Sequence, residues 1–184
     1  MLWNDHSKLA GSHAFLSASN YHWLNYDEAK LKQSFLNHAA VKRGTELHEY
    51  AAMAIKLKRR QPKTKDTLNM YINDAIGFDM NPEQVLFFSE YAYGTADAIS
   101  FKDDFLRIHD LKTGKGPTKM EQLYIYAALF CLEYNIKPGQ IEIETRIYQS
   151  NDVRIDNPDA TTIAPIMSKI KSFDKIIRKM EQEI

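Results

Sequence analysis

The chain has 184 residues, with 24 basic and 24 acidic side chains and a formal net charge of zero. A length of this order predicts a single domain, 1–184, that can bury its own core. The balanced charge gives no overall attraction to nucleic acid, although a local basic groove could coexist with an acidic site. No apolar run approaches the roughly 20 residues of a membrane span, and residues 1–6 lack the pattern of a signal peptide. We therefore expect a cytoplasmic protein without a membrane partner.

Helical spacing dominates the first half of the chain. Ser17 or Ser19 could cap a helix that begins near Asn20, and Asn81-Pro82 is typical of a turn. Three further helices are predicted at 27–39, at 45–60 (opened by Arg43-Gly44-Thr45 and ended by Gln61-Pro62) and at 67–76 (closed by Gly77).

From Val85 onward the composition changes to β-branched and aromatic residues, which favour strands. Strands are predicted at 85–93, 94–101, 105–111 and 141–148, and the second and third form a hairpin around a polar turn at 102–104. Thr118 could cap a helix at 119–134, and a polar loop after 148 leads to a closing helix at 161–184. This order predicts an α/β or α+β domain with a small mixed sheet flanked by helices.

Two carboxylates of the predicted hairpin carry the strongest chemical signal. Asp97 and Asp110 lie on neighbouring strands, so both could reach one end of the sheet. Lys112 shares a strand face with Asp110, because residues i and i+2 point the same way. Carboxylate oxygens suit Mg²⁺ or Mn²⁺, which can activate water for phosphodiester hydrolysis beside a lysine that stabilises charge. An ordinary charged surface hairpin gives the same pattern.

Other polar residues favour the metal site over an ordinary charged hairpin. Gln122 and Tyr126 share a helix face, and Lys119 lies three residues before Gln122, so this stripe could face a phosphate backbone or simply solvent. His48 lies early in a predicted helix and is either a metal ligand or a structural histidine.

Taken in order, these pieces resemble the RecB-like branch of the PD-(D/E)XK nuclease superfamily over roughly 15–150, most of the chain. The resemblance rests on Phe15-Leu16-Ser17-Ala18-Ser19 with Trp23-Leu24, Gly44 with His48, Gly94-Thr95-Ala96-Asp97, Asp110-Leu111-Lys112-Thr113-Gly114, and Gln122 with Tyr126. Asp110 stands where many relatives have glutamate.

The resemblance implies a restriction-endonuclease-like core and a function for each matching residue. Metal ligands would be His48, Asp97, Asp110 and the Leu111 carbonyl, for one or two Mg²⁺ or Mn²⁺ ions; Asp97, Asp110 and Lys112 would be catalytic; Gln122, Tyr126, Lys119 and Lys115 would contact substrate. Some relatives carry a four-cysteine iron–sulfur cluster, which this chain cannot build because Cys131 is its only cysteine.

The implied function is a DNA exonuclease that acts on ends or single strands in recombination, repair or phage replication, in bacterial or phage-infected cytoplasm. The sequence lacks a phosphate-binding loop, so unwinding would come from a helicase, recombinase or annealing-protein partner; a homo-oligomer could help to hold DNA. Three alternatives stay open: a structure- or site-specific endonuclease or resolvase, a non-catalytic nuclease-like DNA-binding protein, and a His109-Asp110 phosphohydrolase. The last is disfavoured because that dipeptide ends a predicted strand, and His109 should point away from Asp110.

Overall fold

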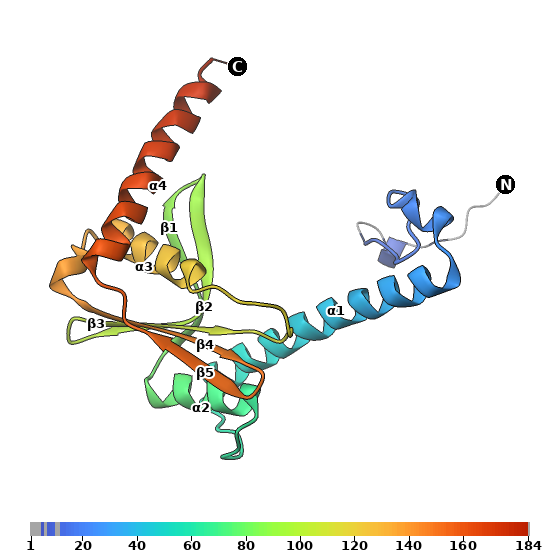
Figure 1. The fold of residues 1–184 in the computed structure, drawn as a ribbon, viewed down its shortest axis with the longest axis horizontal. Helices are drawn as coiled ribbons and strands as arrows, with labels where there is room; N and C mark the ends of the chain where they lie inside the picture. The colour runs from blue at the N-terminus through green and yellow to red at the C-terminus, as the bar shows by residue number, and fades with distance from the viewer. Residues whose placement is uncertain (1–4, 6, 10–11, 184) are drawn as a thin grey trace. The chain divides into compact units, whose positions relative to one another are not determined.

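A computed structural model describes residues 5, 7–9 and 12–183 of the chain (Figure 1). Its elements in chain order are the 3-10 helices η1 (Ser7–Leu9) and η2 (Tyr21–Asn25), then α1 (Glu28–Lys56), α2 (Thr67–Gly77), β1 (Asn81–Ser89), β2 (Ala92–Lys102), β3 (Phe105–Leu111), α3 (Glu121–Glu133), η3 (Pro138–Gln140), β4 (Glu142–Gln149), β5 (Asp152–Asp156) and α4 (Ala160–Glu181). Among the described residues, no helix is both long and apolar enough to cross a membrane.

The chain divides into two compact units, and the boundary falls inside α1, after Thr45. In the first unit, the indole of Trp23 donates a 2.9 Å hydrogen bond to the Ser17 carbonyl, and Phe15 packs edge-on against Phe35. The helix expected near Asn20 is only the short η2. The second unit, 46–184, contains the sheet and all of the predicted site residues.

The prediction of two helices separated near Gly44 is wrong, because α1 is continuous from Glu28 to Lys56. Thr45 does not cap a new helix; its hydroxyl donates instead to the Val41 carbonyl of the preceding turn at 3.3 Å. A glycine inside a helix costs only about 1 kcal/mol relative to alanine, and starting a second helix requires a new, unfavourable nucleus. The single long helix is therefore the more stable solution.

The five strands form one sheet in the order β1-β2-β3-β4-β5. The small mixed sheet that the sequence predicts is confirmed, although only four of its strands were predicted. Only β3 and β4 are parallel, and α3 provides the crossover between them. Asn81-Pro82 is not a turn but the start of β1; proline is tolerated there because β1 is an edge strand. The expected polar loop after β4 contains an unpredicted strand, β5, which returns through a turn at Ser150 and Asn151 with φ of 52° and 61°.

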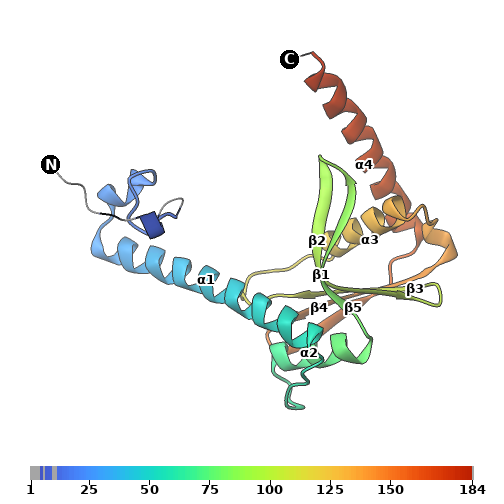
Figure 2. The same cartoon turned by 180° about the vertical axis from the view of Figure 1, so that it is seen from behind.

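Helices cover both faces of the sheet (Figures 1 and 2). The face toward α3 and α4 is packed with aliphatic side chains such as Leu106, Ile108 and Leu123. The face toward α2 carries a second cluster, which also includes Ala51, Ala54 and Ile55 from the end of α1. Within the second unit, His48 of α1, Glu83 of β1 and Asp97 of β2 lie close together, and Lys112, just after β3, contacts Gln122 at the start of α3. The finer expectation of a restriction-endonuclease-like core stays a prediction.

Candidate metal and phosphate site

Asp97 and Asp110 lie where the pairing of β2 with β3 ends. The last recorded pair is Ala98 with His109, so the two carboxylates come next on each strand. One oxygen of Asp97, Oδ2, accepts a 2.8 Å hydrogen bond from the backbone N–H of Leu111. This bond fixes the Asp97 carboxylate against the end of β3. The Leu111 side chain is buried in the core, and the expected use of its carbonyl as a ligand stays a prediction.

Lys112 lies beside Asp110, as the strand period predicted. Its Nζ is 3.1 Å from Asp110 Oδ1, to which it donates, and 3.0 Å from Oδ2. The Asp110 side chain is only 3% exposed, and its Oδ2 accepts no hydrogen bond. Burial, and then the nearby charge of Asp97, raise the pKa of Asp110, while Lys112 opposes the shift. Asp110 is therefore a buried carboxylate whose two oxygens both lie close to the Lys112 ammonium.

A third carboxylate, Glu83, completes the site, and sequence reasoning missed it. Glu83 lies between the cross-strand pairs Pro82–Ala98 and Gln84–Ala96, opposite Asp97. Within the described residues, His48, Glu83 and Asp97 form a group whose potential ligand atoms all lie within 4.8 Å of one another. Glu83 also has φ of 51°, a left-handed conformation that is strained for this residue type and is found most often at functional sites.

His48 reaches the group from α1. Its Nδ1 is 3.5 Å from Asp97 Oδ2, and this contact raises the pKa of the imidazole despite partial burial. Burial, followed by the charge of Asp97, likewise raises the pKa of Glu83. A cation between these groups would oppose the raised pKa of Glu83, because it favours the ionised carboxylate.

The donor set fits a divalent cation. Ligands of Mg²⁺ lie about 2.0–2.1 Å from the ion, so any two are at most about 4.2 Å apart. The 4.8 Å group of His48, Glu83 and Asp97 would reach this spacing through small side-chain rotations. Two carboxylates with one imidazole suit Mg²⁺ and, more strongly, Mn²⁺. Asp110, whose Oδ2 lies 3.0 Å from the Lys112 ammonium, is the next carboxylate beside this group.

Gln122 and Tyr126 on α3 extend the site beyond Lys112. The Lys112 ammonium donates a 2.9 Å hydrogen bond to Gln122 Oε1, and Gln122 Nε2 donates to the Tyr126 hydroxyl at 3.1 Å. Gly94 on β2 makes room for the tyrosine ring, because a Cβ there would lie 2.9 Å from Tyr126 Cε1. Gln122 and Tyr126 therefore share one face of α3, as predicted, and Gln122 holds the Lys112 ammonium by a hydrogen bond.

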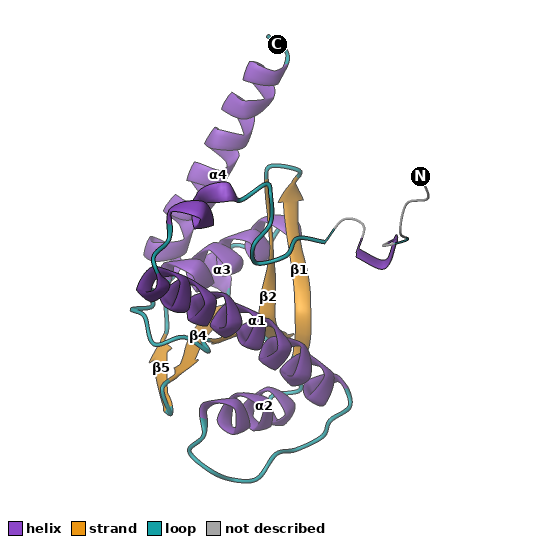
Figure 3. Ribbon diagram, turned by 90° about the vertical axis from the view of Figure 1, so that its right-hand side faces the viewer, coloured by secondary structure: helices purple, strands orange, loops and turns teal. Residues whose placement is uncertain are grey.

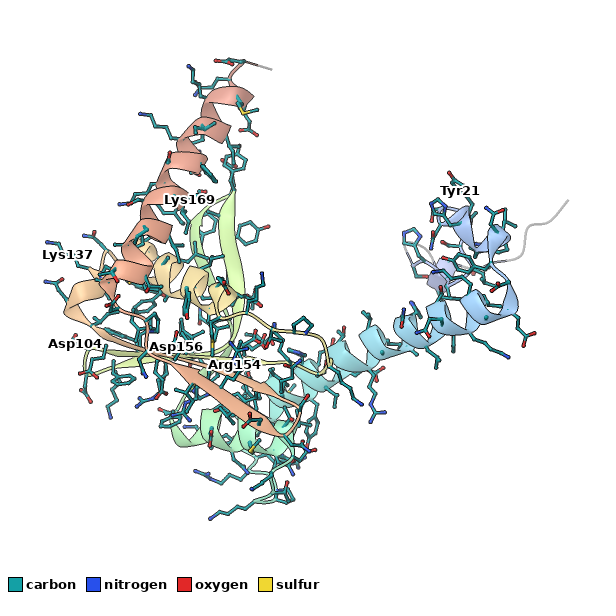
Figure 4. All side chains as sticks on the ribbon, in the orientation of Figure 1. Tyr21, Asp104, Lys137, Arg154, Asp156 and Lys169 are labelled. Carbon is teal, nitrogen blue, oxygen red and sulfur yellow. The ribbon has the colours of Figure 1, made fainter. Side chains whose placement is uncertain are left out.

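The two remaining lysines lie elsewhere. Lys119 precedes α3, so the prediction that it shares the helix face of Gln122 is wrong. The helix begins later because Thr118 is not its cap: its hydroxyl donates to Gln149 at 3.4 Å. Lys119 lines a shallow hollow with Thr118, Met120, Glu121, Tyr124, Arg154, Ile155 and Asp156; Figure 4 labels Arg154 and Asp156 on β5. Lys115 is exposed in the loop between β3 and α3, and its substrate contact stays a prediction.

His109 points away from Asp110, as predicted. Its ring is fully buried and packs edge-on against Phe78 at the end of α2, with Nδ1 3.3 Å from the Tyr148 hydroxyl. Burial lowers its pKa well below the ordinary value. Because the two side chains occupy opposite faces of β3, the dipeptide does not form a joint metal site.

Comparisons with known proteins were made at three levels. No protein-family model, no curated protein and no solved structure matches this chain.

Proposed function

We propose that this chain is a divalent-metal-dependent deoxyribonuclease that hydrolyses phosphodiester bonds. One observation carries the proposal: His48, Glu83 and Asp97 converge within 4.8 Å, next to the buried ion pair of Asp110 and Lys112. An oxygen-rich cation site with an ordered ammonium beside it is the arrangement that phosphoryl chemistry needs.

His48, Glu83 and Asp97 would hold the Mg²⁺ or Mn²⁺ ion, and Asp110 would contact it or a second ion. When bound, the ion supplies a Lewis acid for a phosphoryl oxygen and makes a water molecule easier to deprotonate. Because the Asp97 carboxylate is already fixed by the Leu111 N–H, part of the ordering that binding requires is present before the ion arrives.

Lys112 would stabilise charge on the phosphate or orient the attacking water. A lysine ammonium has three donors, and two of them point to Asp110 and Gln122. The third is available to a phosphoryl oxygen or a water. The chain of bonds through Gln122 to Tyr126 would keep the ammonium in place while the substrate binds, so both α3 residues act on the substrate side of the site.

We further propose that the substrate is DNA with an end or a single-stranded stretch, and that the enzyme is an exonuclease of recombination, repair or phage replication in the cytoplasm of a bacterial or phage-infected cell. A helicase, recombinase or annealing protein would supply unwinding, and self-association would help to retain the DNA. These parts of the proposal rest on the order in which the sequence motifs around Asp97, Asp110 and Gln122 follow one another along the chain.

The test is digestion of end-labelled single- and double-stranded DNA with Mn²⁺, with Mg²⁺ and with chelator. We expect metal-dependent loss of label from linear DNA and little cutting of circular single-stranded DNA. Cutting of the circle would indicate an endonuclease. Binding of DNA without any cleavage in either metal would contradict the proposed activity and favour a non-catalytic DNA-binding protein.

A further inference from the structure

The outer face of the β1–β2 hairpin is apolar and leads to the carboxylates. We call Val85, Phe87, Tyr93 and Thr95 the hairpin face. Val85 pairs with Thr95, and Phe87 pairs with Tyr93, across the two strands. Along the hairpin, both pairs follow the position of Glu83 and Asp97. Figure 3 shows these two strands side by side as a long ribbon.

The intervening residues point the other way, which fixes the orientation of this face. Leu86 is buried in the core beside α3, and its cross-strand partner Gly94 lies against Tyr126 of α3. Side chains alternate along a strand, so the hairpin face is directed away from α3. Glu83 lies two residues before Val85 on β1.

The aromatic pair on this face is both exposed and ordered. Phe87 is 50% exposed and Tyr93 63%, and Val85 beside them is 48% exposed. The two rings stack with centroids 6.3 Å apart and an interplanar angle of 28°. Burying a large apolar side chain stabilises a protein substantially, so two adjacent aromatic rings left in solvent indicate a binding surface more strongly than isolated ones.

We infer that the hairpin face binds a single-stranded stretch of the DNA substrate, with Phe87 and Tyr93 stacking on its bases. This inference rests on the proposed function. Aromatic rings stack on any base, and the face itself carries no charge, so bases and not phosphates are the matching chemistry. The phosphates would be contacted at the metal group and Lys112, at the other end of the same ribbon.

The distance along β1 between Glu83 and Phe87 is short enough for one DNA strand to reach both the metal group and the aromatic pair. Phe87 is four residues from Glu83, which corresponds to about 13 Å along a strand. A nucleic-acid strand advances about 3.4 Å per stacked nucleotide. A phosphate at the metal group would therefore have bases at the aromatic pair within about four nucleotides.

The test measures binding of a labelled oligothymidylate of about 16 nucleotides, with Ca²⁺ replacing Mn²⁺ to limit cutting. We expect Phe87→Ala with Tyr93→Ala to weaken binding about tenfold or more, and Phe87→Tyr with Tyr93→Phe to keep it. Tyr134→Ala is the matched control, because Tyr134 is also an exposed aromatic, at 52%, but lies at the end of α3.

Two further measurements separate stacking from a general loss of structure. An oligonucleotide with abasic sites should bind the wild-type protein as weakly as oligothymidylate binds the double alanine variant. The salt dependence of binding should be the same in both proteins, because stacking releases no counterions. If the alanine variant unfolds, photo-crosslinking of a bromouracil oligonucleotide to wild-type protein should label the peptide containing 85–95; labelling elsewhere would overturn the inference.

The outcomes for the hairpin face and for the nuclease activity are distinguishable. If the wild-type protein cuts DNA but the alanine variant binds oligothymidylate equally well, the hairpin face is not the binding surface and the nuclease proposal stands. If binding depends on Phe87 and Tyr93 but no cutting occurs with Mn²⁺, the nuclease proposal fails and the hairpin inference stands. Self-association that the alanine variant loses, with unchanged DNA affinity, would assign the face to a second copy of the chain.

Discussion

Two polar clusters of the second unit differ in charge balance. The cluster on the α2 side pairs two arginines with two carboxylates: Arg146 contacts Glu144 at 2.9 Å and Asp74 at 3.4 Å, and Arg107 contacts Glu144 at 3.3 Å. Tyr148 completes it by donating to Asp74 at 2.7 Å.

The cluster around Asp97 combines three carboxylates with one lysine and one histidine. Burial, and then repulsion from Asp97, raise the pKa of Glu83 and of Asp110. Neighbouring residues of β3, His109 and Asp110, belong to the two different clusters. A balanced cluster stabilises the fold by itself, whereas an unbalanced one is expected where a ligand of the opposite charge binds. The contrast thus predicts that ligand binding depends on the second cluster and that folding stability depends on the first.

The largest expected effect is on cleavage by variants of the unbalanced cluster. Asp110→Asn and Lys112→Ala should each lower the single-turnover rate with Mn²⁺ at least about 100-fold, because each removes a charged side chain that would lie beside the reacting phosphate. Tyr148→Phe, in the balanced cluster, is the control and should cleave at the wild-type rate. Near-normal rates in both site variants would remove Asp110 and Lys112 from the mechanism.

The next effect is stabilisation by metal. Mn²⁺ at about 100 times its Kd should raise the free energy of unfolding by about 2.7 kcal/mol, seen as a higher Tm. Glu83→Gln and Asp97→Asn should lose most of this increase, and His48→Ala should lose more of it with Mn²⁺ than with Mg²⁺. Asp74→Asn, in the balanced cluster, should keep the full increase even if its starting Tm is lower. An equal increase in Glu83→Gln would exclude Glu83 as a ligand.

Removing the Tyr148 hydroxyl tests the structural cluster. Tyr148→Phe should reduce the free energy of unfolding by about 1–2 kcal/mol, because Asp74 loses a hydrogen bond to a charged acceptor. Urea denaturation of both proteins without metal measures this change in the free energy of unfolding. An unchanged stability would mean that the Asp74–Tyr148 bond makes no net contribution to folding.

The pH dependence of stability should reveal the buried imidazole. The pKa of His109 is depressed in the folded protein, so below about pH 6.5 the unfolded chain binds a proton that the folded one does not. Stability is therefore lost as the pH falls, by about 1 kcal/mol between pH 6.5 and 5.5. Urea titrations of wild-type and His109→Gln protein at both values measure this contribution as the difference between their two pH-dependent changes, because His48, whose pKa is raised, contributes with the opposite sign in both proteins.

The smallest effect concerns the packing that orders Lys112. Gly94→Ala would place a Cβ 2.9 Å from the Tyr126 ring and shift the bond to Gln122, so we expect cleavage to fall about threefold to tenfold. Gly139→Ala is a matched control, since its Cβ would meet Ala160 at an ordinary 3.6 Å. A Gly94→Ala rate as high as that of the control would mean that Tyr126 does not position the lysine.

Much of the sheet could be predicted from the sequence, because its strands alternate and its turns are polar. The hairpin of β2 and β3 and the shared face of Asp110 and Lys112 follow from a period of two residues. The long α1 was predicted as two helices, since Gly44 and Thr45 are typical of a boundary and only the folded context decides against it. The short β5 was missed, although Ser150-Asn151 between alternating residues is a hairpin signal.

The site itself was predicted only in part. Asp97, Asp110 and Lys112 are close in sequence, and their relation depends on local geometry. Glu83 follows Asn81-Pro82, which was interpreted as a turn, so its carboxylate was placed outside the sheet. Only the register of β1 against β2 puts it opposite Asp97, and register between strands depends on packing of the whole domain.

The left-handed backbone at Glu83 also affects how the protein would respond to selection in the laboratory. Glycine or asparagine adopts φ near 51° with less strain than glutamate does, and either would remove a negative charge from a crowded group. A library screened for heat resistance alone should therefore enrich Glu83→Gly and Glu83→Asn. The survivors would be better folded and worse at binding metal, so a thermostability screen should include metal in every round.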